Sequence, residues 1–143
     1  MTISYRNIRS GFTLIELVIA IAILAVLAIL VGPRVMQVLE NARSSSTKSN
    51  LKTLKTAIDM FKVDTGKYPT RLRDLVEKPR EESVARNWAK GGYIEGGDLP
   101  KDSWNEDFQY KRTPEGKTPY DLYSYGANGP SAPKEEWISV WIN

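Results

Sequence analysis

The chain lacks cysteine and histidine altogether among its 143 residues. Without cysteine there is no disulfide framework, and no thiol is present for the acyl anchor of a lipoprotein. Without histidine, the Ser-His-Asp and Cys-His catalytic arrangements, the HExxH zinc motif and a histidine base are all excluded. No convergent polar site is visible among the carboxylates and tyrosines that remain. We therefore expect a protein that is not an enzyme.

The chain also has little excess charge. It carries 20 Lys and Arg against 17 Asp and Glu, and Arg6 and Arg9 account for two of the three net positive charges. No long basic cluster with interleaved aromatic residues occurs, so we expect no nucleic-acid partner. With residues 1–33 set aside, about 110 residues remain, which is enough for one small domain.

One long apolar run lies near the N-terminus, FTLIELVIAIAILAVLAILV (residues 12–31). Twenty helical residues span about 30 Å, the thickness of the hydrocarbon core of a bilayer. The segment from Leu17 to Val31 has no polar side chain, which is rare in a soluble helix. We predict a single transmembrane helix, and Arg6 and Arg9 favour a cytoplasmic N-terminal side.

An ordinary secretory signal peptide is the alternative interpretation of this run. Such a peptide has a shorter apolar stretch, followed by a small-x-small cleavage site. The A-x-A matches here lie inside the run, as at Ala20-Ile21-Ala22, and cleavage there would leave an apolar new terminus. The transmembrane interpretation is therefore preferred.

Glu16 is the one charged residue in the run. A carboxylate costs about 2.5–3.5 kcal/mol at the centre of a membrane helix and less toward an end. Glu16 either lies shallow enough to reach the head groups or has a cationic partner. Cleavage after Gly11 would create an α-amine on Phe12, and the amine of a neighbouring subunit would be a better partner than the chain's own. The two charges would then neutralise each other only on assembly.

The segment GFTLIE (residues 11–16), after a short basic leader, resembles the class III signal of type IV pilins and pseudopilins. This resemblance implies cleavage after Gly11 by a prepilin peptidase and N-methylation of Phe12. It also implies an assembly role for Glu16, at the fifth position of the mature chain. Pro33 falls where the family places a proline that kinks the helix.

Beyond the membrane segment, the sequence predicts a continuing helix. Pro33 has no N–H to donate, so a kink or a melted turn is expected there. The polar stretch 41–50 is interpreted as a solvated helical stalk rather than a flexible linker. An apolar stripe then predicts a face that packs on a sheet: Leu51, Leu54, Ala57, Ile58 and Phe61. Gly66 is expected to end the helix.

Strand patterns come late in the chain. Residues 79–107 are expected to form a long irregular loop. Residues 108–112 and 120–125 alternate around a turn at 114–116 and predict a hairpin, and residues 137–142 predict a third strand. In that strand Trp137, Ser139 and Trp141 should share one face.

The predicted fold class is α+β and pilin-like, with a long N-terminal transmembrane and stalk helix packed on a small C-terminal antiparallel β-sheet. The predicted divisions are a leader, residues 1–11; a helix, residues 12–64, with a transmembrane part at 12–32, a kink near 33 and a periplasmic stalk at 34–64; and a globular domain, residues 65–143.

Later segments narrow the resemblance. ARNW (85–88), GGYI (91–94), LPKDSW (99–104) and YSYGANG (123–129) resemble, in this order, the major pseudopilins of type II secretion systems, the general secretion pathway protein G family. Ser103 stands where the family usually has proline, and Asn105 where it has glycine. The turn is expected to differ in detail there.

The resemblance also raises the question of calcium, which this family commonly binds in a loop near the C-terminus. The matching positions are the carbonyls of Tyr125 and Pro130 and the side chains of Asn128, Glu135 and Glu136. Calcium takes six to eight oxygen ligands, several of them anionic, and the neutral Asn128 stands where the family has aspartate. Two interpretations stay open: a calcium site, weakened by this change, or a solvated proline-rich loop.

The function implied by the resemblance is that of a structural subunit. Copies would form a helical filament, the periplasmic pseudopilus, which helps to drive exoproteins across the outer membrane. The implied partners are minor pseudopilins, an inner-membrane platform protein, an assembly ATPase and the prepilin peptidase. The subunit would be a single-pass protein of the bacterial inner membrane with its C-terminal domain in the periplasm.

Two alternatives to this function are kept. One is a type IV pilin acting in adhesion, motility or DNA uptake, although major pilins often close their C-terminal region with a cysteine pair that is absent here. The other is a membrane-anchored enzyme or binding module, for which a polar site would be needed.

Overall fold

The structure is a computed structural model that describes residues 11–141. The predicted leader, apart from Gly11, and the last residue of the predicted third strand, Ile142, lie outside the described residues. The chain divides into two units, one up to Leu39 and one from Glu40 onward. One helix, α1 (Leu14–Thr65), contributes to both units.

In the first unit, α1 is formed by the apolar run. The helix passes through Gly32 and Pro33 without losing its helical assignment, so the predicted melted turn is absent. The helix continues on both sides of Pro33 with one hydrogen bond missing, because Pro33 has no N–H to donate to the carbonyl of Ile29. The kink at Pro33 stays a prediction.

In the second unit, α1 provides one side of the hydrophobic core. Residues 41–50 are helical, which confirms the stalk interpretation. The predicted stripe is confirmed as well, since Leu54 and Ile58 are 0% exposed and Leu51, Ala57 and Phe61 are buried. The helix ends at Thr65, and Gly66 follows with φ +77° and an N–H that donates to the carbonyl of Lys62 at 2.8 Å. A glycine adopts this left-handed conformation without strain.

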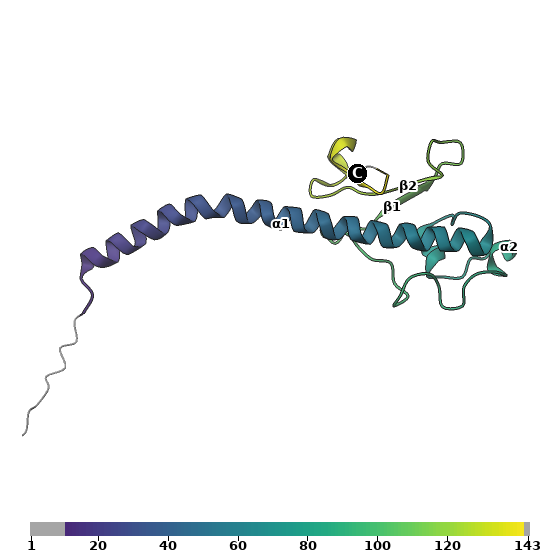
Figure 1. Ribbon diagram of the computed structural model, residues 1–143, viewed down its shortest axis with the longest axis horizontal. Coiled ribbons are helices and arrows are strands. Elements are labelled where there is room, and N and C mark those ends of the chain that lie inside the picture. Colours follow the sequence, from purple (N-terminus) through teal and green to yellow (C-terminus); the bar gives the residue numbers. More distant parts are fainter. Residues whose placement is uncertain (1–10, 142–143) are drawn as a thin grey trace, which may run out of the picture. The chain divides into compact units, whose positions relative to one another are not determined.

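A three-stranded antiparallel sheet provides the other side of the core, in the order β1-β2-β3. The strands are β1 (Gln109–Arg112), β2 (Tyr120–Ser124) and β3 (Ile138–Ser139). β1 and β2 form the predicted hairpin and lie beside the C-terminal part of α1 (Figure 1). Tyr120 and Leu122 point into the core that the stripe of α1 completes, which confirms the predicted fold class.

The third strand is shorter than predicted, and one of its residues is misplaced in the prediction. Ser139 pairs with Tyr123, and the Trp137 ring stacks on the Tyr123 ring at 4.7 Å, so these two residues share the outer face of the sheet. Trp141 instead donates from its indole N–H to the carbonyl of Tyr120 at 2.8 Å. Strand pairing ends at Ser139, and the chain turns there, so the predicted common face is wrong for Trp141.

The segment between α1 and the sheet is largely irregular, as predicted, with two short helices. These are η1, a 3-10 helix (Leu72–Leu75), and α2 (Glu82–Ala85). The sequence indicated a short helix at the position of η1 but not α2. Leu75, Val84 and Ile94 fix the segment to the core. Two further 3-10 turns precede β3: η2 (Gly129–Ser131) and η3 (Lys134–Glu136).

Candidate functional site

Glu16 and Thr13 form a hydrogen-bonded cap at the start of α1. The backbone N–H of Thr13 donates to Oε2 of Glu16 at 2.8 Å, and the Thr13 hydroxyl donates to the same oxygen at 2.9 Å. The backbone N–H of Glu16 donates in turn to Oγ1 of Thr13 at 3.3 Å. This reciprocal arrangement is a capping box, with Thr13 as N-cap and Glu16 three residues on.

The capping box gives Glu16 a role within its own chain that our sequence reasoning missed. Four N–H groups at the start of a helix have no partner in the helix, and leaving them unpaired in lipid is costly. The T-x-x-E pattern before an apolar run is the signal that predicts such a cap.

The cap leaves half of the Glu16 carboxylate available. Both side-chain hydrogen bonds go to Oε2, and within residues 11–141 no donor reaches Oε1. A carboxylate offers about four lone-pair directions, so one oxygen can cap the helix while the other accepts a cation. Helix capping and pairing with the amine of another subunit are therefore compatible.

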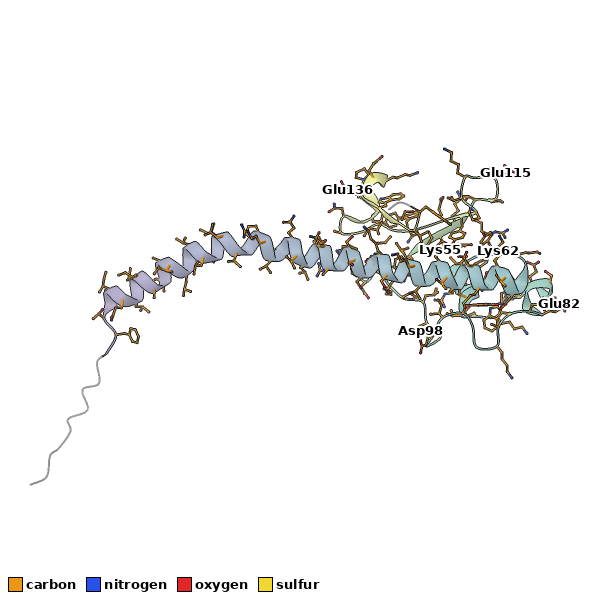
Figure 2. All side chains as sticks on the ribbon, viewed as in Figure 1. Lys55, Lys62, Glu82, Asp98, Glu115 and Glu136 are labelled. Atoms are coloured by element: carbon orange, nitrogen blue, oxygen red, sulfur yellow. The ribbon has the colours of Figure 1, made fainter. Side chains whose placement is uncertain are left out.

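The apolar surface of the first unit has no cover. Every residue from Phe12 to Leu39 is exposed, and Phe12 (93%) and Ile29 (74%) are among the most exposed large side chains. Figure 2 shows these side chains standing out all around this part of α1. Among the described residues α1 is the one helix long and apolar enough to cross a membrane. A surface of this kind needs lipid or other apolar helices around it.

The second candidate site is the loop after β2. Of the predicted calcium-binding side chains, the structure brings Asn128 and Glu136 together, with Nδ2 of Asn128 donating to Oε2 of Glu136 at 2.7 Å. Glu135 is exposed, and within the described part of the chain it makes no hydrogen bond or ion pair. Figure 2 marks Glu136 in this loop.

The acidic side chains of this loop do not converge as a calcium site requires. The ion takes six to eight oxygens, several of them charged. No group of three or more acidic side chains that could hold a metal ion occurs between residues 11 and 141. Asn128 also presents its N–H donor, rather than its oxygen, to the carboxylate of Glu136.

Aromatic rings cover one side of this loop. The Trp137 ring stacks on Tyr123, and the Tyr125 ring meets the edges or faces of both at centroid distances of 5.5 and 5.0 Å. Burial and the neighbouring hydroxyl of Tyr125 raise the pKa of Tyr123 above its ordinary value. The cluster holds the end of the loop on the outer face of the sheet.

Ser103, which departs from the family pattern, ties the loop before β1 to α1. Its N–H donates to Oγ1 of Thr47 at 3.1 Å, and its hydroxyl donates to the carbonyl of Arg43 at 2.9 Å. Thr47 is fully buried and donates its hydroxyl to Oγ of Ser103 at 3.0 Å. A proline at this position could form none of these bonds. The expected difference of this turn from the family stays a prediction.

The other departure, Asn105, keeps the backbone that glycine would allow. Its φ is +68°, in the left-handed region, which asparagine adopts more readily than most residues. Next to it, buried Asp102 accepts from the N–H groups of Trp104 and Glu106 and from the hydroxyl of Ser124. These bonds join the turn to the end of β2.

The chain has a capped helix of membrane length, and the same helix contributes to the core of a small domain with an antiparallel sheet. These features are those of one class of protein, the pilin-like filament subunits. Within that class, the sequence model of the family described as "Type II secretion system (T2SS), protein G" matches residues 34–141. A model described as "Prokaryotic N-terminal methylation motif" matches residues 6–32. The chain belongs to the type II secretion system protein G family.

Individual relatives agree with this assignment. The chain is 42% identical over 127 residues to the type II secretion system core protein G of Pseudomonas aeruginosa, covering 87% of each chain. It is 42% identical over 124 residues to that of Klebsiella pneumoniae, covering 85% of this chain and 86% of the relative.

A solved structure gives the same result for the fold. The crystal structure of the major pseudopilin from the type 2 secretion system of enterohaemorrhagic Escherichia coli matches with a TM-score of 0.62 and 34% identity. The match covers 74% of this chain and 88% of that one. The predicted assignment to the major pseudopilins of type II secretion, rather than to the type IV pilins, is confirmed.

Proposed function

We propose that this chain is cut after Gly11, methylated on Phe12 and held in the bacterial inner membrane by α1, with its second unit in the periplasm. Copies then leave the membrane to form a helical filament. The observation that carries the proposal is the exposed apolar surface from Phe12 to Leu39, with a capped carboxylate at Glu16 near its start.

The assembly step exchanges lipid contacts for contacts between helices. Lipid tails are as apolar as leucine side chains, so burying this surface against other helices gains little from the hydrophobic effect. Packing between helices and pairing of polar groups therefore have to supply the preference for the filament over the membrane. Glu16 is the charged group of the segment from Phe12 to Val31 and is therefore the strongest source of that preference.

We assign the partner of Glu16 to the Phe12 amine of a neighbouring subunit. In its own chain the carboxylate is engaged through Oε2 with Thr13, and Oε1 remains for a donor from outside. An amine on a neighbour that is offset along the filament meets Oε1 without disturbing the cap. Removing one member of a buried ion pair costs about 3–5 kcal/mol, which is enough to fix the subunit register.

The remaining parts of the proposal follow from family membership. We assign to this chain the role of a structural subunit whose filament helps exoproteins to cross the outer membrane, with no catalytic step of its own. Its further partners are minor pseudopilins, an inner-membrane platform protein, an assembly ATPase and a prepilin peptidase.

The test separates the charge of Glu16 from its capping role. Glu16→Gln keeps a hydrogen-bond acceptor at the third helical position, which also suits a capping box, but it removes the charge. Glu16→Val removes both. We expect both variants to insert in the membrane and both to lose filament assembly by at least about 100-fold, as the loss of about 3–5 kcal/mol implies.

Two readouts make this test decisive. Mass spectrometry of the membrane-resident subunits should find methylated Phe12 as the first residue in all variants. Electron microscopy and sedimentation should then quantify the filaments. If Glu16→Gln assembles like the unaltered chain while Glu16→Val does not, capping rather than charge pairing is the role of Glu16. A chain that keeps its leader, or is cut after Ala22, would contradict the processing step.

A further inference from the structure

The loop between β2 and β3 is closed by its own hydrogen bonds. At its start, the N–H of Gly126 donates to the hydroxyl of Ser124 at 2.9 Å. The carbonyl of Gly126 then accepts from the N–H of Gly129, and the carbonyl of Gly129 accepts from the N–H of Ala132 at 3.1 Å. These carbonyls face donors of the loop itself.

The second half of the loop is held in the same way. The indole N–H of Trp137 donates to the carbonyl of Ala132 at 3.1 Å, and the N–H of Glu136 donates to the carbonyl of Pro133 at 3.0 Å. Stacking of the Trp137 ring on Tyr123, with planes only 8° apart, fixes this half on β2. Local bonds therefore hold both halves of the loop, while within residues 11–141 no donor reaches the carbonyls of Tyr125 and Pro130.

One side-chain hydrogen bond joins the two halves of the loop. Nδ2 of Asn128 donates to Oε2 of Glu136 at 2.7 Å, a short distance that is typical of a bond to a charged acceptor. An aspartate at position 128 would place a second carboxylate against Glu136, and like charges this close require a cation between them. The amide of Asn128 supplies a positive N–H in place of that cation.

We propose that the Asn128–Glu136 hydrogen bond replaces calcium in this chain, so that its second unit folds and stays folded independently of the ion. The donor set supports this directly, because the loop offers an amide N–H and one carboxylate where calcium needs several converging anionic oxygens. The inference does not rest on the proposed function, since it concerns the stability of one subunit.

The first arm of the test measures the unaltered chain. The full-length protein in detergent is unfolded thermally in millimolar calcium chloride and in excess EGTA, and calcium is also titrated into it in a calorimeter. We expect the same Tm in both solutions and no heat of binding. A Tm that rises with calcium, or a saturable heat, would overturn the proposal.

The second part of the test places a negatively charged carboxylate at position 128. Asn128→Asp should lower the Tm by several degrees in EGTA, since the loss of a charge-assisted hydrogen bond and the gain of a like-charge contact both act in the same direction. Calcium should restore much of that loss. If Asn128→Asp in EGTA is as stable as the unaltered chain, the contact does not close the loop and the proposal fails.

Two adjacent glutamates provide a matched control. Glu136→Ala removes the acceptor of Asn128, whereas Glu135→Ala removes an equal charge from an exposed side chain with no partner in the described part of the chain. We expect a lower Tm for Glu136→Ala alone, independent of calcium. Equal effects of the two substitutions would show that net charge, and not the hydrogen bond, stabilises the loop.

Discussion

At the scale of single residues, two tyrosines of the core differ in one hydrogen bond. The Tyr110 hydroxyl donates to the carbonyl of Pro69 at 2.8 Å. The Tyr120 hydroxyl is buried without a partner among the described residues. Burial raises the pKa of both hydroxyls above the ordinary value, so both stay protonated at physiological pH. An unpaired buried hydroxyl costs stability, whereas a paired one contributes to it.

Removal of these hydroxyls should therefore have opposite effects. Tyr120→Phe should raise the free energy of unfolding by about 1 kcal/mol, because it removes an unsatisfied polar group. Tyr110→Phe should lower it by about 1–2 kcal/mol, because it leaves the Pro69 carbonyl unpaired. Denaturant unfolding of both variants measures the difference. Changes of the same sign would show that the hydrogen bonds of these hydroxyls are misassigned.

Glu81 predicts a pH dependence. Its carboxylate accepts from the Lys67 ammonium at 2.7 Å and from the Ser83 hydroxyl, and these bonds lower its pKa below the ordinary value of 4.5. Since the folded pKa is depressed, the stabilisation is present above pH 4.5 and is lost as the pH falls through the folded pKa.

Glu81→Gln should show this loss directly. Its Tm should lie below that of the unaltered chain at neutral pH, and the gap should shrink as the pH falls below 4.5. Glu82→Gln, next to it, is the control. Among residues 11–141 the Glu82 carboxylate has one long contact, 3.8 Å to Arg86, and its side chain is 90% exposed. A gap for Glu81→Gln that stays constant or widens in acid would contradict the assignment.

At the scale of elements, the contact of Ser103 with Thr47 joins the loop before β1 to α1. Ser103→Pro removes both the N–H that donates to Thr47 and the hydroxyl that donates to Arg43. We expect it to lower the free energy of unfolding by about 1–3 kcal/mol, because it leaves the buried Thr47 hydroxyl short of partners. Ser103→Ala keeps the N–H and should cost less. Denaturant unfolding that ranks the two variants in the opposite order would refute this role.

The sequence predicts those helices and strands whose apolar residues repeat regularly over several turns or over a whole strand. The stripe from Leu51 to Phe61 and the hairpin of β1 and β2 were predicted because helical and strand periodicities are set by neighbouring residues. α2 is four residues long, too short to show a period. The alternation around Trp137 resembled a longer strand, but strand pairing ends at Ser139 and the Trp141 indole donates to the carbonyl of Tyr120. That contact joins residues distant in the sequence, so local alternation does not reveal it.

In the candidate sites, too, local motifs were visible in the sequence, whereas contacts that depend on the folded loop were not. Glu16 and the loop residues were assigned from motifs, and their roles stay predictions. The orientation of the Asn128 amide toward Glu136 depends on the turns η2 and η3, which the sequence does not specify. The capping box of Thr13 and Glu16 was within reach of the sequence, since its T-x-x-E pattern is local.

At the scale of the whole molecule, the two units have different requirements. The second unit, from Glu40 onward, has its own hydrophobic core. Every described residue of the first unit is exposed, so this unit depends on its surroundings. A chain of this kind is complete only in a membrane or in an assembly of copies, which agrees with its membership of the type II secretion system protein G family.

The central claim, that Glu16 of one subunit pairs with the Phe12 amine of another, is tested most directly by an electron cryo-microscopy structure of the assembled filament. We expect Oε1 of each Glu16 within about 4 Å of the methylated Phe12 nitrogen of a neighbouring subunit, while Oε2 keeps its bonds to Thr13. A filament in which the Glu16 carboxylate has no cation from another subunit within that distance would contradict the account.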